Sequence, residues 1–422
     1  MKSGDCVEKI CSNVPVAGVF DVIVCGGGPA GCAAALRSAR EGARTLLIEK
    51  QQSLGGVWTA GLMPWILDHR NKVGLLTEIK EKLSERGGFF PRPSTFTAPP
   101  EEIRFLLEEL CCESGVVLRY DTIVSGALTK KGRLQTLLTE SPSGTEAWQA
   151  EVFIDATGNG DLAARAGCRF EYGNELNLAQ PASLNALISG LPQEAVENLL
   201  VTSPDGKEKF RETLIRAGVT PSYGKPSLFH FGCGIFGLMS HHAYGCCGFD
   251  ADSLTQAIIA GRRELHQQIA ALRKLPGWQD LVLLGTAAQL GIREGRRVAG
   301  RERLSVAALA SEAPASKSVC ISQFPIDIHA LDPAKGDSYS NGGYRNQSHG
   351  FGIPQGALIS ADLDNLLMAG RCISGDAVMH ASYRVTGNAV PMGEAAGAMA
   401  AGAVSKKCFP REISDLPCFS KI

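Results

Sequence analysis

The sequence predicts an α/β fold in which a domain with a parallel central sheet and a small β meander is interrupted by an inserted α+β domain. Residues 21–50 read as a buried strand, a glycine turn, a helix and a second strand, which together form one unit of a parallel sheet. Turn signals at Lys131-Gly132 and Ser143-Gly144 predict a meander that returns to the sheet through Val152–Asp155. Residues 166–350 contain no second glycine motif after a strand, so we expect them to form the insertion.

Length and composition indicate a globular protein with one or two hydrophobic cores. The chain has 422 residues, of which 44% are hydrophobic and 20% are charged, and its formal net charge is -1. Because there is no basic excess, we expect no nucleic-acid partner and no anionic membrane surface. No run reaches the roughly 18 apolar residues of a membrane span, and the N-terminus lacks the apolar core of a signal peptide. A cytoplasmic location is therefore expected, and the sequence leaves the formation of a homo-oligomer open.

The 14 cysteines do not predict a disulfide framework or a metal site. They are scattered along a long chain, and no C-x-x-C pair occurs. No group of cysteines and histidines has the spacing of zinc ligands, so we expect no metal. The adjacent pairs Cys111-Cys112 and Cys246-Cys247 are interpreted as structural thiols in a reducing compartment.

The first glycine turn has the pattern of a phosphate-binding loop. Gly26, Gly28 and Gly31 form G-x-G-x-x-G directly after the apolar run that ends at Cys25. The first glycine permits the tight turn, the second lets a pyrophosphate approach the backbone, and the third allows close packing of helix and strand. Pro29 suits the first helical position, where its missing N–H is not needed. The helix that begins near Ala30 would direct its free N–H groups toward phosphate.

An acidic residue closes this unit. The second strand, Thr45–Ile48, ends at Glu49, which is followed by Lys50. Glu49 lies 18 positions after Gly31, where a carboxylate can accept hydrogen bonds from both hydroxyls of an adenosine ribose. The complete unit of strand, turn, helix, strand and acid predicts a dinucleotide site, for which FAD and NAD are the two candidates.

Three later segments favour FAD, because they resemble parts of flavoproteins with two dinucleotide-binding domains. Gly55-Gly56 follows the second strand, D-A-T-G occurs at 155–158, and A-G-R-C-I-S-G-D occurs at 369–376. Together with G-I-R-E-G-R-R at 291–297, they resemble the FAD-dependent oxidoreductase family, with a glutathione-reductase-type FAD fold. No cysteine follows the paired glycines, so the chain resembles members without a redox disulfide.

The resemblance implies which residues surround the cofactor. Residues 18–165 and 351–405 would form the discontinuous FAD-binding domain and 166–350 the capping, substrate-binding domain, with tails at 1–17 and 406–422. A helix that starts at Pro391 would point its N-terminus at the flavin ring, and Asp376 would bind the ribityl hydroxyls. For Trp58, core packing is the alternative to a position beside the flavin. The implied cofactor residues are Gly26, Gly28, Pro29, Ala30, Gly31, Glu49, Lys50, Gly55, Gly56, Val57, Trp58, Val124, Thr157, Gly158, Gly370, Asp376, Asn388 and Ala389.

Substrate residues are expected where His380, Arg384 and Asn388 repeat at intervals of four. This spacing is more distantly similar to that of fumarate reductase and succinate dehydrogenase flavoproteins, in which the arginine binds a substrate carboxylate. Arg384 would then bind an anionic or polar substrate, and His380 would donate a proton or orient another group. The alternative is that Arg384 pairs with an acid and His380 packs in the core.

Further candidates come from the inserted region. His241 or His242 could face the flavin from the capping domain, and surface or core positions are the alternative. Arg293, Arg296 and Arg297 are interpreted as an ion-pair cluster on a helix, with Arg293 also a candidate for substrate contact. The glycine-rich segment 335–358 is expected to be either a lid over the site or an ordinary surface loop.

The sequence thus predicts an FAD-dependent oxidoreductase that transfers a hydride between a small polar organic substrate and flavin N5. The flavin would exchange electrons with an external acceptor or donor, since no second nucleotide-binding unit is present in the sequence. Two alternatives stay open, namely a fumarate-reductase-like ene-reductase and a non-catalytic flavoprotein subunit that relays electrons.

Overall fold

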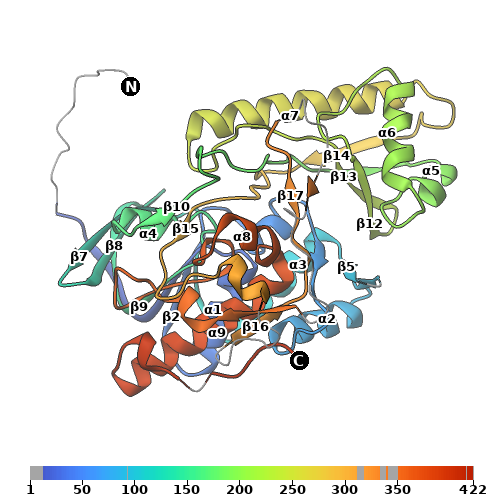
Figure 1. Cartoon of the computed structure of the whole chain (residues 1–422). Helices are drawn as coiled ribbons and strands as arrows, with labels where there is room; N and C mark the ends of the chain where they lie inside the picture. The colour runs from blue at the N-terminus through green and yellow to red at the C-terminus, as the bar shows by residue number, and fades with distance from the viewer. Residues whose placement is uncertain are drawn as a thin grey trace, which may run out of the picture.

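The computed structural model describes residues 13–92, 94–310, 318–332, 339–340, 350–414 and 416–421. These residues form two lobes, each with its own hydrophobic core (Figure 1). The larger core extends from Phe20 to Phe419, and the smaller one draws its residues from Ala182 to Leu290. The predicted α/β class with a parallel central sheet is confirmed. Of segment 335–358, expected to be either a lid or a surface loop, residues 335–338 and 341–349 lie outside the described residues.

A seven-stranded sheet forms the centre of the larger lobe. Its main order is β6-β2-β1-β9-β8-β7, and β20 pairs with the last residues of β9, from Phe153 to Asp155. Strands β6, β2, β1, β9 and β20 run parallel, whereas β7 and β8 are antiparallel. The paired residues Val22–Cys25, Thr45–Ile48, Val152–Asp155 and Leu366–Met368 are buried, and most of them are apolar. The strands are β1 (Val16–Cys25), β2 (Thr45–Ile48), β6 (Val117–Arg119), β7 (Ile123–Lys130), β8 (Arg133–Ser141), β9 (Gly144–Asp155) and β20 (Leu366–Met368).

Strand β9 joins the meander to the parallel sheet. Its first half pairs with β8, from Leu137 opposite Trp148 to Ser141 opposite Gly144. Its last residues pair with both β1 and β20, and the ladder ends at Asp155 beside Cys25 and Met368. The carboxyl ends of three parallel strands therefore meet at one edge, where α/β sheets bind their ligands.

Small residues let two helices pack closely on this sheet. Helix α1 (Pro29–Arg40) crosses helix α9 (Thr386–Lys406), and both are largely buried. A methyl group on Gly393 would lie 2.1 Å from the carbonyl oxygen of Ala30, which is far inside van der Waals contact. The predicted helix start at Pro391 is wrong, because α9 begins at Thr386. Pro391 occupies the sixth helical position, where it costs a single backbone hydrogen bond.

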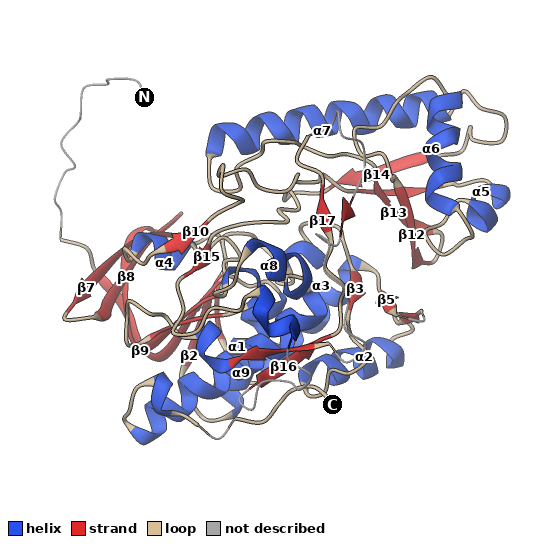
Figure 2. Ribbon diagram, viewed as in Figure 1, coloured by secondary structure: helices blue, strands red, loops and turns tan. Residues whose placement is uncertain are grey.

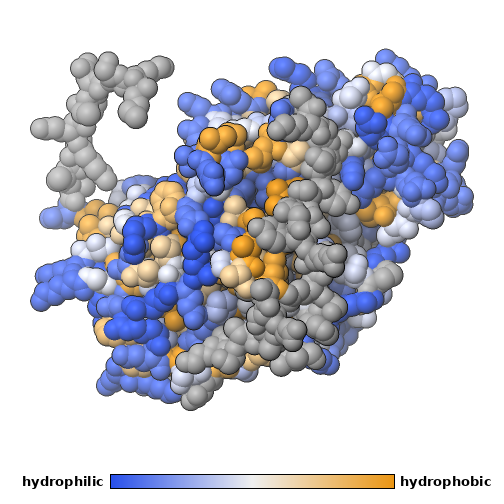
Figure 3. Space-filling model, in the orientation of Figure 1, coloured by the Kyte–Doolittle hydropathy of each residue, from blue (hydrophilic) through white to orange (hydrophobic). Residues whose placement is uncertain are grey.

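The smaller lobe is the cap. Its sheet has the order β12-β13-β11-β14, and helix α7 runs across the top of the view above these strands (Figure 2). Hydrophobic residues gather between the two lobes on the face shown, whereas most of the remaining visible surface is hydrophilic (Figure 3). The cap elements are β11 (Ala186–Ser189), α5 (Gln193–Asn198), α6 (Gly206–Arg216), β12 (Ser227–Gly232), β13 (Ile235–Met239), α7 (Ala251–Leu272) and β14 (Val282–Thr286).

The remaining elements connect these parts. A three-stranded sheet of order β3-β5-β4 lies near α2, and short two-stranded ladders join β10 to β15, β16 to β19, and β17 to β18. No helix among the described residues is long and apolar enough to cross a membrane. The elements are β3 (Trp65–Leu67), α2 (Leu75–Glu85), β4 (Phe90–Pro91), β5 (Thr95–Thr97), α3 (Pro100–Glu113), α4 (Asp161–Arg165), β10 (Phe170–Glu171), β15 (Arg297–Val298), β16 (Ser318–Ser322), β17 (Ile328–His329), β18 (Tyr339–Ser340), β19 (Phe351–Pro354) and α8 (Ala377–Tyr383), with 3-10 turns at Gly56–Trp58, Val306–Ala310, Gln355–Leu358, Gly370–Cys372 and Pro410–Glu412.

Glu394 gives the fold a pH dependence. Its side chain is buried between α9 and α2, and its Oε1 accepts a hydrogen bond from Leu75 N at 3.1 Å. Burial raises the pKa of Glu394 to about 7 from its ordinary value of 4.5. Between these values the folded state binds more protons than the unfolded state, so stability falls as pH rises through this window.

We expect Glu394→Gln to remove this dependence. At pH 8 the variant should be more stable than the parent by on the order of 1–3 kcal/mol, and at pH 4.5 the difference should disappear. Urea unfolding curves recorded from pH 4.5 to 8 measure the effect. An unchanged stability slope across this range would show that Glu394 is not the group responsible.

Candidate active site

One large cavity lies between the carboxyl edge of the central sheet and the cap. Its volume is about 1070 Å³, which is large enough for a dinucleotide together with a small molecule. Its wall includes the following predicted residues: Gly26, Gly28, Pro29, Ala30, Glu49, Lys50, Gly56, Val57, Val124, Thr157, Gly158, Gly370, Arg384 and Ala389. Segments from both ends of the chain thus converge on a single site, as the sequence predicted.

The glycine turn is fixed by hydrogen bonds that leave its helix end open. Gly26 has a φ of 101°, and its N–H donates to Ile48 O at 2.7 Å. The Glu49 carboxylate accepts from Gly27 N at 2.5 Å and from Gln51 N at 2.8 Å. No side chain of the described residues caps α1, and no acidic residue lies in its first turn. The positive end of α1 is therefore available to an anion in the cavity.

The D-A-T-G loop forms the neighbouring part of the wall. Asp155 Oδ1 accepts from the Thr157 N–H at 3.0 Å and from its hydroxyl at 2.7 Å, while Oδ2 accepts from Ala163 N at 2.9 Å. The buried guanidinium of Arg371 donates to Gly158 O at 2.8 Å and also binds Ile292 O. Arg371 thus joins three distant segments at the cavity.

Several predicted cofactor residues lie behind the wall and support it. Gly31 packs against the carbonyl of Gly26, and Gly55 N donates to Gly27 O at 2.8 Å. Trp58 is buried, and its indole N–H donates to Thr386 Oγ1 at 2.9 Å, which fixes the start of α9. Asp376 does not face the cavity. It caps α8 by accepting from Met379 N at 2.7 Å and also accepts from Val306 N at 2.8 Å.

The predicted residues His242, His380 and Asn388 also do not line the cavity. His380 is fully buried with its ring edge against Tyr383, and burial holds its pKa well below the ordinary value. It is therefore neutral near pH 7, which does not favour a role as proton donor. His242 stacks on Tyr223 with ring centroids 3.9 Å apart, and Tyr223 lines the cavity whereas His242 does not. Asn388 donates to Ser322 Oγ at 2.9 Å.

Arg384 lines the cavity and also has an acidic partner. Its Nη2 lies 3.5 Å from Asp327 Oδ2 and donates to the Asp327 carbonyl at 2.8 Å. Asp327 also pairs with His329, with 3.3 Å between Oδ2 and Nε2. Burial alone would raise the pKa of Asp327, but His329 and Arg384 lower it to about 2. Asp327 is therefore ionised at neutral pH and neutralises much of the charge of Arg384.

Arg293 is the second cavity arginine, and its recorded partners are uncharged. Its Nη1 donates to Pro181 O at 2.6 Å and to Ser183 Oγ at 2.8 Å. Among the described residues, no carboxylate lies within ion-pair distance of its guanidinium. Burial and the nearby charge of Arg384 lower its pKa to about 10, so it stays protonated at neutral pH. The cap side of the cavity therefore carries an excess of positive charge, to which Lys207 adds.

The interpretation of 293–297 as a helical ion-pair cluster is only partly right. Arg296 pairs with Asp161 and Arg297 with Glu294, but Arg293 does not join them. The segment contains the short strand β15 in place of a helix. Four cavity residues were not predicted from the sequence, namely Asp327, His329, Tyr223 and Lys207. The D-x-H spacing after Phe324-Pro325 was the available signal for Asp327 and His329.

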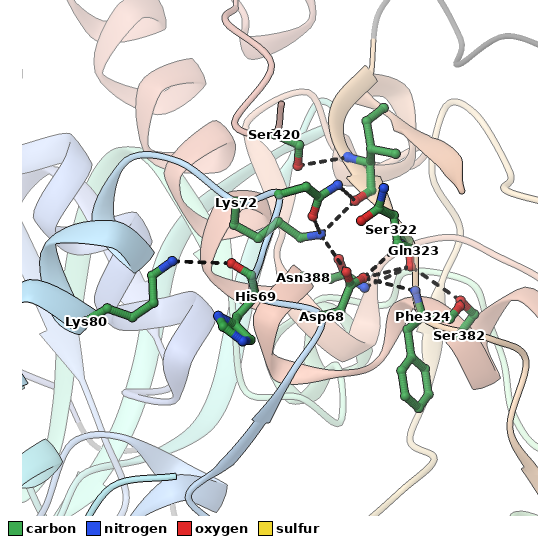
Figure 4. A network of polar contacts seen from close by, with 12 residues as sticks. Asp68, His69, Lys72, Lys80, Ser322, Gln323, Phe324, Ser382, Asn388 and Ser420 are labelled. Atoms are coloured by element: carbon green, nitrogen blue, oxygen red, sulfur yellow. Dashed lines mark hydrogen bonds and ion pairs between the residues drawn. The ribbon is translucent and has the colours of Figure 1, made fainter. Parts of the chain in front are cut away.

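A buried polar network stands behind one wall of the cavity (Figure 4). The Lys72 ammonium donates to Asp68 Oδ1 at 3.0 Å, to Asn71 Oδ1 at 2.5 Å and to Ile321 O at 2.7 Å. Asp68 Oδ2 accepts from Gln323 N at 2.9 Å and from Phe324 N at 3.2 Å. The network therefore connects the turn after β3 to the segment that continues into the cavity wall at Phe324.

A model of the family described as FAD dependent oxidoreductase matches residues 21–422. The chain belongs to this family. The match covers the larger lobe and the cap together, so it includes the whole cavity. The protein is accordingly an FAD-dependent enzyme, and the predicted cofactor is confirmed.

Curated relatives match a shorter part of the chain. The thiamine thiazole synthase of Methanococcus vannielii is 28% identical over 149 residues, which are 33% of this chain and 56% of that protein. The enzyme of the same name from Methanococcus aeolicus is 27% identical over 165 residues, which are 37% of this chain and 60% of that protein. The chain thus spans a little over half the length of the curated relatives that it matches.

Solved structures match over more of the chain at low identity. The p-nitrophenol 4-monooxygenase PnpA of Pseudomonas putida is 11% identical, with a TM-score of 0.48, and the match covers 96% of this chain and 84% of that one. A geranylgeranyl bacteriochlorophyll reductase-like protein of Thermoplasma acidophilum is 15% identical, with a TM-score of 0.46, and the match covers 92% and 80%.

The cavity fits FAD by its volume and its donors. Apart from Gly28, its chain neighbours and the adjoining helix backbone, no described heavy atom lies within 4 Å of the position that a Cβ on Gly28 would take, so the backbone is open to the cavity there. The uncapped ends of α1 and α9 both reach the wall, and they offer N–H groups to phosphate and to the polar edge of the flavin. Gly28 and Ala30 would hold the pyrophosphate, Glu49 the ribose, and Ala389 would lie at the flavin.

Proposed function

We propose that the protein transfers a hydride between a small anionic organic substrate and FAD, and that an external acceptor or donor completes the cycle. The supporting observation is Arg293, a guanidinium on the cavity wall whose hydrogen-bond partners are uncharged and which has no carboxylate of the described residues within ion-pair distance. A charge removed from water without a directly bound counter-ion is costly. A substrate carboxylate would offset that cost through charge-assisted hydrogen bonds. When bound, FAD supplies N5 as the hydride acceptor or donor.

The surrounding residues would then orient the substrate. Ser183 and the carbonyl of Pro181 hold the guanidinium of Arg293 in place at the cavity wall, and its Nη2 also approaches Met239 Sδ at 3.8 Å. Asp327 fixes the guanidinium of Arg384, which lies at the end of helix α8. Burial and Arg293 lower the pKa of His329 to about 4, so its ring is neutral at pH 7 and adds no charge.

The first test compares acids with matched uncharged molecules. We expect the visible absorption band of the purified flavoprotein to bleach under anaerobic conditions with small 2-hydroxy or 2-amino acids. Their methyl esters should react at least about 10-fold more slowly, because one charge-assisted hydrogen-bond pair contributes about 1.5–3 kcal/mol.

Two controls separate this proposal from the alternatives. Chemically reduced enzyme is mixed with 2-enoic acids, because oxidation of the flavin by these acids alone would indicate an ene-reductase. Bleaching that requires a protein partner would indicate an electron relay, and esters that react as fast as acids would refute the anionic substrate.

A further inference from the structure

The buried pair of Asp68 and Lys72 lies behind the cavity and holds the segment that forms its wall. The side chains are 3% and 0% exposed, and neither belongs to the wall. The pair binds the backbone at residues 321–324, and the chain continues from there into the cavity wall, which includes Phe324 to Asp327. Because Asp327 is the ionic partner of Arg384, the position of this segment sets the position of both charges.

Both side chains of the pair have backbone partners on that segment. Lys72 Nζ donates to Ile321 O at 2.7 Å, and Asp68 Oδ2 accepts from Gln323 N at 2.9 Å and from Phe324 N at 3.2 Å. Gln323 and Phe324 follow strand β16, whose ladder with β19 ends at Ser322, whereas Ile321 lies within the strand opposite Gly352. Asp68 thus takes the place of a strand partner directly after the end of the ladder, where the chain reaches the cavity wall at Phe324.

The same turn also locates the start of α9. A methyl group on Gly387 would lie 2.0 Å from Leu67 O and 2.5 Å from Asp68 O, so the helix rests directly on this backbone. Asn388 Nδ2 donates to Ser322 Oγ at 2.9 Å, which ties the helix to β16 as well. Three segments that are distant in sequence thus meet at the pair, and two of them reach the cavity.

Stability does not explain this arrangement. A buried ion pair loses the hydration of both ions, and apolar replacements of similar volume often do as well. Asp68 also has a left-handed backbone with a φ of 56°, which is unfavourable for a residue other than glycine. We infer that Asp68 and Lys72 are positioning residues, which fix the Phe324–Asp327 wall and so determine how Arg384 is presented to the substrate. The inference rests on the proposed function, because it assigns Arg384 and Asp327 to the substrate side of the cavity.

The test uses the flavoprotein with Asp68→Asn, Lys72→Met and the double substitution. In Asp68→Asn, an amide oxygen that accepts from Gln323 N and Phe324 N leaves the NH₂ group facing the Lys72 ammonium, where both groups are donors. Lys72→Met removes the hydrogen bond to Ile321 O and leaves the carboxylate of Asp68 without its counter-ion. Both single variants should therefore release the wall. Deuterium exchange in peptides covering 318–327 should become about 10-fold faster. The Kd of benzoate, read from its perturbation of the flavin absorption band, should rise about 10-fold. The neutral double variant should restore both values to within about threefold of the parent.

A matched control removes volume from a distant core. Leu137→Ala in β8 should lower stability without changing exchange at 318–327 or the affinity for benzoate. Unchanged exchange in both single variants, or a double variant that is no better than the singles, would overturn the inference. The exchange measurement needs no ligand, so failure of the parent to bind benzoate would count against the proposed function alone.

Discussion

Replacement of Arg293 by Met should abolish the preference for anionic substrates while leaving FAD bound. Met keeps most of the side-chain length and removes the charge that Pro181 and Ser183 hold at the wall. Loss of one partner from a buried, hydrogen-bonded charge pair costs about 2–5 kcal/mol. We therefore expect kcat/KM for the acid substrate to fall on the order of 100- to 1000-fold, with less than about a threefold change for its methyl ester. Anaerobic single-turnover bleaching measures both rates.

Three variants calibrate this result. Arg293→Lys keeps the charge but loses the paired donors, so its rate should lie between those of the parent and Arg293→Met. Arg303→Met makes the same replacement at a half-exposed ion pair with Glu171 and should leave both rates unchanged. Arg384→Met should affect acid and ester alike, since it leaves the half-buried carboxylate of Asp327 with only the neutral ring of His329 as a partner. Equal losses for acid and ester in Arg293→Met would remove Arg293 from substrate recognition.

The two arginines also show where sequence analysis reaches its limit. Arg384 was singled out because its spacing from His380 and Asn388 is visible within nine residues. Whether a cavity arginine already has a counter-ion depends on segments far away in the sequence. Asp327 approaches Arg384 across 57 residues, and Pro181 approaches Arg293 across 112. No local pattern contains that information, so the sequence could name the candidates but could not rank them.

Local motifs were predicted well where all their contacts are local. The unit from Gly26 to Glu49 forms as expected, because its turn, helix and acid contact one another within 25 residues. The start of α9 was predicted five residues too late. Proline normally marks a helix start, but here the first turn is fixed by Trp58 and by the backbone at Leu67, which are tertiary contacts. Asp376 was likewise assigned to a ligand because its tertiary contact is not visible in the sequence. In the fold its carboxylate accepts hydrogen bonds from the backbone at 306 and 379.

Gly28 and Gly31 belong to one motif, yet their replacement by Ala should have opposite consequences. A Cβ on Gly31 would lie 1.7 Å from the carbonyl oxygen of Gly26, which is fixed backbone. We expect Gly31→Ala to lower stability on the order of 3–5 kcal/mol, since helix α1 must move off the turn. Urea unfolding of the apoprotein, or failure to obtain folded protein, measures this effect.

Gly28 should instead report on the cofactor. Its φ of -71° is accessible to Ala, and none of the described atoms lies within 4 Å of the new methyl group. The stability of the apoprotein should therefore change by less than about 0.5 kcal/mol. The methyl would fill the space through which a pyrophosphate approaches the backbone, so the Kd of FAD should rise on the order of 100-fold. Fluorescence titration of the apoprotein with FAD gives that Kd. If Gly28→Ala bound FAD as tightly as the parent, the pyrophosphate could not lie over this turn. Parent-like stability in Gly31→Ala would mean that α1 can move away from the carbonyl of Gly26 without cost.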